Sequence, residues 1–67
     1  MRKKILLHAF RAELAEDLTA SRFYGELSAE QQARVLDYVN RSHNELEAVA
    51  RSATALRRLR EGRIDFI

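Results

Sequence analysis

The chain has 67 residues, of which 46% are hydrophobic and 33% are charged, and its formal net charge is +2. This length allows one domain with a small core, and the hydrophobic content is too high for an intrinsically disordered chain. The absence of cysteine excludes disulfide bonds and thiolate zinc sites, and the absence of proline with only two glycines is typical of a helical protein. We therefore expect one all-α domain over residues 1–67, a small bundle of three to four short helices.

The first predicted helix covers residues 3–16. Its apolar side chains fall on one stripe at helical spacing, namely Leu7, Phe10, Leu14 and Leu18. Residues 17–21 (DLTAS) are poor helix formers and favour a break, so a short second helix is expected over 19–24. Gly25 is expected to end it, because glycine readily takes the left-handed conformation that closes helices. One continuous helix over 3–24 is the alternative.

A third helix is predicted over residues 29–41. Ser28 and Gln31 have the spacing of a capping box, in which the two side chains satisfy backbone N–H groups at the helix start. The apolar residues Val35, Leu36 and Val39 then recur at helical spacing. This regular pattern predicts an inward face for the third helix.

The final helix is predicted over residues 43–61. A run of polar residues (NRSHN) interrupts the pattern before it, and Ser42 with Glu45 repeats the capping-box spacing. Gly62 is expected to close the helix. Its expected apolar set is Leu46, Val49, Ala53, Leu56 and Leu59. Over the whole chain, the residues predicted to be mostly buried are Leu14, Leu18, Tyr24, Leu27, Val35, Leu36, Val39, Leu46, Val49 and Leu56.

The tail over residues 63–67 is apolar, although chain ends are usually polar and exposed. A lone bundle of this size has little net stability, and pairing two copies would cover the apolar surface that the tail adds. We therefore expect a homodimer. Its predicted interface consists of Leu6, Phe10, Ile64, Phe66 and Ile67.

Basic residues gather toward the end of the last helix. The candidate contacts to an anion or a nucleic acid are Arg51, Arg57, Arg58, Arg60 and Arg63. Such a cluster can neutralise phosphates, and it also suits the C-terminal end of a helix dipole. Aromatic residues that could stack on bases are few and are expected in the core. Nucleic-acid binding is therefore the second hypothesis.

The sequence offers no motif for catalysis, for a cofactor or for a metal. His8 and His43 fall on different predicted helices and lack the spacing of metal ligands, and Ser28 and Ser42 are explained as helix caps. No apolar run is long enough to cross a membrane or to form a signal peptide. We expect a non-enzymatic, cytoplasmic protein without a cofactor.

A set of core and cap residues resembles the C-terminal helical module of the YdeI/OmpD-associated (bacteriocin-protection) family. The matching residues are Leu14-Ala15-Glu16-Asp17, Ala20, Phe23-Tyr24, Leu27-Ser28, Tyr38-Val39, Ser42-His43 and Leu59-Arg60-Glu61-Gly62-Arg63. Two departures lie at Ala29, where the module usually has a proline, and at the start of the last helix, where only Arg51 has a counterpart among the module's arginines. The resemblance covers residues 14–63, implies a helical fold and transfers no catalytic residue.

Two classes of function follow. The leading hypothesis is a small module that binds a protein partner, beginning with a second copy of itself. The alternative is a nucleic-acid-binding regulator that uses the C-terminal arginines. Salt dependence separates the two, because binding to nucleic acid falls steeply with added salt and apolar association does not.

Overall fold

The computed structural model describes residues 2–67, with side chains from residue 7 onward. Within those residues the chain forms α1 (Arg2–Glu16), α2 (Leu18–Glu26), α3 (Ala29–Asn40) and α4 (Glu45–Arg60), without a strand. The prediction of a small all-α bundle is therefore confirmed.

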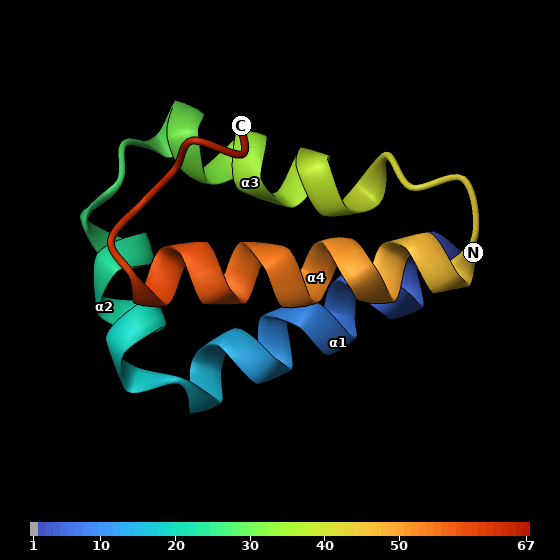
Figure 1. Ribbon diagram of the computed structural model, residues 1–67, viewed down its shortest axis with the longest axis horizontal. Helices are drawn as coiled ribbons and strands as arrows, with labels where there is room; N and C mark the ends of the chain where they lie inside the picture. The colour runs from blue at the N-terminus through green and yellow to red at the C-terminus, as the bar shows by residue number, and fades with distance from the viewer. Residues whose placement is uncertain (1) are drawn as a thin grey trace.

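Helix α4 lies at the centre of the bundle and packs against the other three helices (Figure 1). Helix α1 runs beside it in the same direction, α3 returns along its other side, and α2 crosses the end where α4 finishes. The tail then turns back from the end of α4 toward α3. This arrangement leaves one side of α4 without a covering helix.

The break between α1 and α2 lies at Asp17 alone. Its backbone is extended, and its Oδ1 accepts a hydrogen bond of 3.1 Å from the backbone N–H of Ala20, which makes it the N-cap of α2. The alternative of one helix over 3–24 is thus wrong. The break also ends the apolar stripe of α1, so Leu18, which was predicted to be buried, is 70% exposed.

Helix α2 ends differently from the prediction, because it continues through Gly25 to Glu26. At this end the carbonyl of Tyr24 accepts from the backbone N–H of the C-cap residue Leu27 at 3.1 Å and from Gln32 Nε2 of α3 at 3.0 Å. The predicted capping box of α3 is confirmed: Gln31 N–H donates to Ser28 Oγ at 3.1 Å and Ser28 N–H to Gln31 Oε1 at 3.0 Å. An extended backbone at Leu27, with a polar side chain from the next helix, therefore ends α2 in place of the expected glycine stop.

Helix α4 begins at Glu45, and its N-cap is Asn44, whose Oδ1 accepts from Glu47 N–H at 2.8 Å. The predicted capping box of Ser42 with Glu45 is wrong. Ser42 is buried and its hydroxyl donates to the carbonyl of Val39 at 2.8 Å, so it serves the end of α3 instead. Asn44 and Glu47 lie two positions after Ser42 and Glu45, so α4 begins two residues later than predicted.

The end of α4 follows the prediction. Gly62 has a φ of 73°, in the left-handed region. Its N–H donates to the carbonyl of Leu59 at 3.0 Å, and Arg63 N–H donates to the carbonyl of Arg58 at 2.8 Å. These two bonds form a Schellman motif, which satisfies the carbonyls at the helix end.

The core lies where α4 meets the other helices. Its buried apolar residues are Phe10, Leu14, Ala20, Val35, Val39, Ala48, Ala55 and Leu59. Of the residues predicted to be mostly buried, Leu14, Val35 and Val39 are buried, and Tyr24, Leu27, Leu36 and Leu56 are half-buried against the core. The prediction is wrong for Leu18, Leu46 and Val49, which are exposed.

Candidate interaction surface

The orientation of α4 is set by small residues and by one arginine. Ala48 and Ala55 are buried, and their small side chains let neighbouring helices approach α4 closely. Arg51 reaches α3, where its Nη1 donates to the carbonyl of Tyr38 at 2.9 Å and its guanidinium lies 4.8 Å from the centre of the Tyr38 ring. Residues two positions apart in a helix point about 200° apart around its axis. Because Arg51 points toward α3, Val49 points away from α3.

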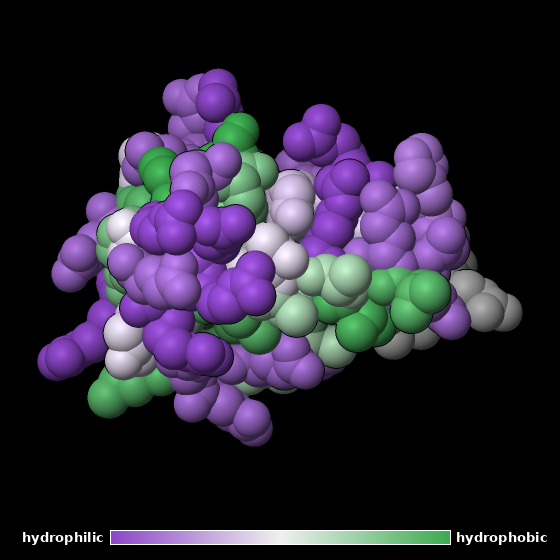
Figure 2. All heavy atoms as spheres, viewed as in Figure 1, coloured by the Kyte–Doolittle hydropathy of each residue, from purple (hydrophilic) through white to green (hydrophobic). Residues whose placement is uncertain are grey.

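The first half of α4 consequently presents apolar side chains to solvent. Leu46 is 82% exposed and Val49 is 59% exposed. Ala53 follows at helical spacing and is also exposed, as is Ala9 on the adjacent α1. We call these four residues the α1–α4 face. Figure 2 shows apolar side chains gathered over the start of α4, giving way to polar ones toward its end.

A shallow depression lies within this face, between α1 and α4. Its lining residues are Ala9, Phe10, Glu13, Val49, Ser52 and Ala53, and its volume is about 160 Å³. Sites for cofactors and small substrates are commonly about 300–1,000 Å³. The depression is therefore smaller than such sites and has room for one or two side chains.

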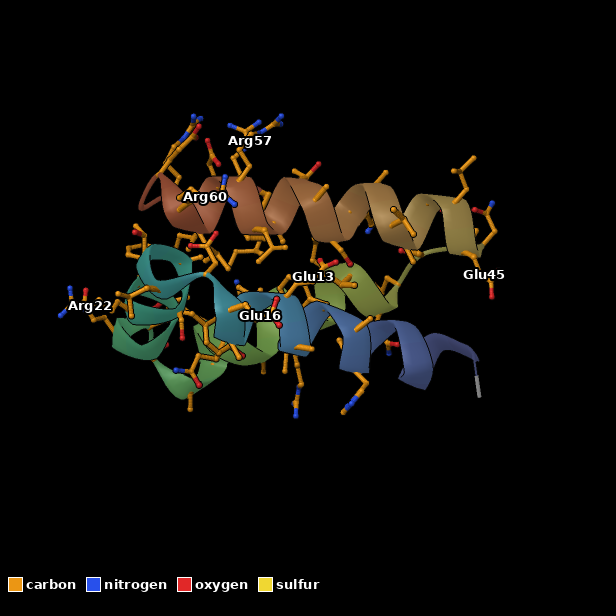
Figure 3. All side chains as sticks on the ribbon, turned by 90° about the horizontal axis from the view of Figure 1, so that it is seen from below. Glu13, Glu16, Arg22, Glu45, Arg57 and Arg60 are labelled. Atoms are coloured by element: carbon orange, nitrogen blue, oxygen red, sulfur yellow. The ribbon has the colours of Figure 1, made fainter. Side chains whose placement is uncertain are left out.

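The charged groups of α4 are separated along its length. Its first turn contains Glu45 and Glu47, and its last turn contains Arg57, Arg58 and Arg60. Figure 3 shows Glu45 at one end of α4 and Arg57 and Arg60 at the other, with the Arg57 side chain pointing into solvent. Because each charge suits the helix dipole at its end, α4 is acidic at its start and basic at its end.

Four of the five predicted anion-binding arginines lie in ion pairs with carboxylates of the same chain. Arg51 pairs with Glu47 at 3.2 Å, Arg58 with Asp65 at 3.7 Å, Arg60 with Asp17 at 2.7 Å, and Arg63 with both Glu61 and Asp65. Arg57 is the remaining one, and it is exposed. The structure thus does not join the five into one basic surface.

These contacts shift the pKa values of the carboxyl groups. The backbone N–H of Ala20, followed by Arg60, lowers the pKa of Asp17 below its ordinary value. The backbone N–H of His43, with a smaller effect of Arg51, lowers the pKa of Glu47 in the same way. Both carboxylates hold a helix start and a neighbouring cation, so their charge has a structural role.

The apolar tail packs on the helices of its own chain. Ile64, Phe66 and Ile67 are half-buried against the core, and the Phe66 ring lies edge-on to Tyr38 with the ring centres 5.1 Å apart. Phe10, another residue of the predicted dimer interface, is only 1% exposed and has no surface to offer a partner. The side chain of Leu6 lies outside the described residues. The tail therefore packs on the core of its own chain, and each of its three apolar side chains stays partly exposed.

A second depression, of about 360 Å³, lies between α2 and the end of α4. Its charged residues Arg22, Glu26, Arg60 and Glu61 are all exposed to water, and Arg60 is engaged by Asp17.

In the part of the chain that the structure describes, no three His, Asp or Glu side chains form a group that could hold a metal ion. Nor does any helix in that part have the length and apolarity needed to cross a membrane.

In comparisons with models of protein families, with curated proteins and with solved structures, no match to this chain was found. The resemblance to the YdeI/OmpD-associated module therefore stays a hypothesis. The candidate surface rests on the geometry of the chain itself.

Sequence reasoning assigned Leu46 and Val49 to the core and so missed the α1–α4 face. A signal for the correct assignment exists in the sequence. Ala48, Ser52, Ala55 and Leu59 recur at spacings of four, three and four residues, as a second helical stripe whose first three side chains are small. The larger leucine and valine formed the stronger pattern, and only packing against α1, α2 and α3 decided which stripe is buried.

Proposed function

We propose that this protein is a non-enzymatic helical module that binds a protein partner through the α1–α4 face. The single observation that carries the proposal is that two large apolar side chains, Leu46 and Val49, are exposed about one turn apart on the same side of α4. Isolated exposed apolar residues are common, whereas neighbouring ones beside a depression are typical of protein-binding surfaces. Ala53 and Ala9 extend this surface and, because they are small, let a partner approach closely.

The charge distribution supports a protein partner over a nucleic acid. Nucleic-acid binding relies on unpaired cations arranged along a surface, and four of the five candidate arginines are already paired with carboxylates. The partner-binding face, by contrast, contains no charge between Leu46 and Ala53 on its exposed stripe. The resemblance to a helical module without transferable catalytic residues fits the same function. We further propose a cytoplasmic location, because a chain without cysteine has no disulfide bond that would require an oxidising compartment.

Site-specific photo-crosslinking in the native host tests this function. A photoreactive amino acid at position 49 should form protein adducts, because this position lies at the centre of the α1–α4 face. Position 18 is the matched control. Leu18 is also a large apolar residue, 70% exposed, but it belongs to α2, the helix that crosses the far end of α4 (Figure 1). Absence of adducts at position 49, or equal adducts at both positions, would contradict the proposal.

Two variants of the purified protein complete the test. Val49→Asp should abolish binding of the crosslinked partner, because it places a charge in a surface that must lose water on binding. Leu18→Asp should leave binding intact. If the protein instead binds duplex DNA or structured RNA near physiological salt, and Arg57→Ala removes that binding, the nucleic-acid hypothesis replaces this one.

A further inference from the structure

The exposed stripe of α4 continues beyond its apolar half. From Leu46 through Val49 and Ala53 the helical spacing leads to Arg57, so all four side chains lie on one side of the helix. The stripe is roughly 16 Å long, from the rise of an α-helix. Ala50, which is also exposed, lies beside Ala53 at its middle. The stripe thus has a large apolar end, a flat alanine centre and a basic end.

Because its two ends differ in charge, the stripe is complementary to the same stripe of a second copy that runs in the opposite direction. The first turn of α4 contains Glu45 and Glu47, and the last contains Arg57, Arg58 and Arg60. In an antiparallel pair of α4 helices, the acidic end of each copy meets the basic end of the other. At that basic end Asp65 and Asp17 engage Arg58 and Arg60, so the contact falls to the exposed Arg57. In a parallel pair, like charges and like ends of the helix dipoles would meet, which is unfavourable.

We propose that the partner on the α1–α4 face is a second copy of this chain, with the two α4 helices packed antiparallel about a two-fold axis near Ala50 and Ala53. This inference rests on the proposed function, because it assigns an occupant to the same surface. In this arrangement Leu46 of each copy lies against the aliphatic part of Arg57 in the other, and that guanidinium faces Glu45. The alanines at the centre allow the two helix backbones to approach closely.

The arrangement differs from a dimer formed through the tail. Ile64, Phe66 and Ile67 are half-buried against the core of their own chain, whereas Leu46 and Val49 are exposed. The contact surface is small, so the dimer is expected to be weak and to form at micromolar concentrations or above. Its two-fold symmetry means that each substitution alters two contacts at once.

A charge-exchange experiment tests the inference by sedimentation equilibrium of the full chain. Arg57→Glu and Glu45→Arg should each weaken dimerisation about tenfold, since two symmetry-related ion pairs become repulsive together. The double variant E45R/R57E should restore dimerisation, because the exchanged charges again face each other. Arg34→Glu and Glu30→Arg change the net charge identically on the exposed side of α3, and they should have no effect.

The outcomes distinguish failure of this inference from failure of the proposed function. A wild-type chain that stays monomeric at high micromolar concentration, or a double variant that stays as weak as the single ones, overturns the antiparallel dimer. Adducts at position 49 with a different protein would then leave the proposed function standing. Dimerisation that Val49→Asp abolishes and that E45R/R57E retains supports both.

Discussion

Replacing Leu59 by alanine should destabilise this protein far more than the same replacement at Leu46. Leu59 is 0% exposed and Leu46 is 82% exposed, although both were assigned by sequence to the inward face of one helix. Removing three carbon groups from a buried leucine costs about 2.4 kcal/mol in transfer free energy, and the cavity left behind brings the total to about 2–5 kcal/mol. At Leu46 the change should stay within about 0.5 kcal/mol.

Urea denaturation followed by circular dichroism measures the difference. A bundle of this size has a net stability of roughly 3–5 kcal/mol, so the Leu59→Ala variant is expected to lose a large share or all of its stability. Leu59→Met keeps the volume and serves as the folded control, with a loss below about 1.5 kcal/mol. The measurements belong at low micromolar concentration, where self-association contributes least. Equal losses at the two leucines, or a larger loss at Leu46, would refute the orientation of α4.

Three further predictions concern helix ends and pH. Gly25→Ala should stabilise the protein by about 0.5–1 kcal/mol, because Gly25 lies inside α2 and an added Cβ would meet no other atom. Gly62→Ala should destabilise the protein by about 1–2 kcal/mol, because Gly62 has a left-handed φ of 73°. Thermal unfolding of the two variants checks both signs. Ser28→Ala and Asn44→Ala should each cost about 0.5–2 kcal/mol in denaturant unfolding, as losses of N-caps. In the folded protein the pKa of Asp17 lies below its ordinary value of 3.8. The ionised Asp17 therefore contributes its full share to the free energy of unfolding above pH 3.8, and this contribution is lost as the pH falls through the lower folded pKa. Asp17→Asn keeps a capping side chain but cannot titrate, and its stability curve below about pH 4 should therefore be flatter.

The sequence by itself determined the class of fold and most of its local structure. Composition and helical spacing indicated an all-α bundle. Two helix-end motifs were also assigned correctly, although the stop at Gly25 and the cap at Ser42 were not. Ser28 with Gln31 forms the predicted capping box, and Gly62 takes the predicted left-handed conformation. These features depend on short-range hydrogen bonds and backbone sterics, which the order of residues specifies directly.

The tertiary structure alone decided the features that depend on contacts between helices. Gln32 of α3 satisfies the end of α2 in place of Gly25, and Phe66 of the tail packs on Tyr38 of α3, which a local pattern cannot reveal. The candidate surface is the clearest case. Leu46 and Val49 gave the stronger apolar pattern, but small side chains at Ala48 and Ala55 permit the closer packing of α4 on three neighbours. Which stripe of a helix is buried depends on the shapes of all the helices around it, and that information is spread over the whole chain.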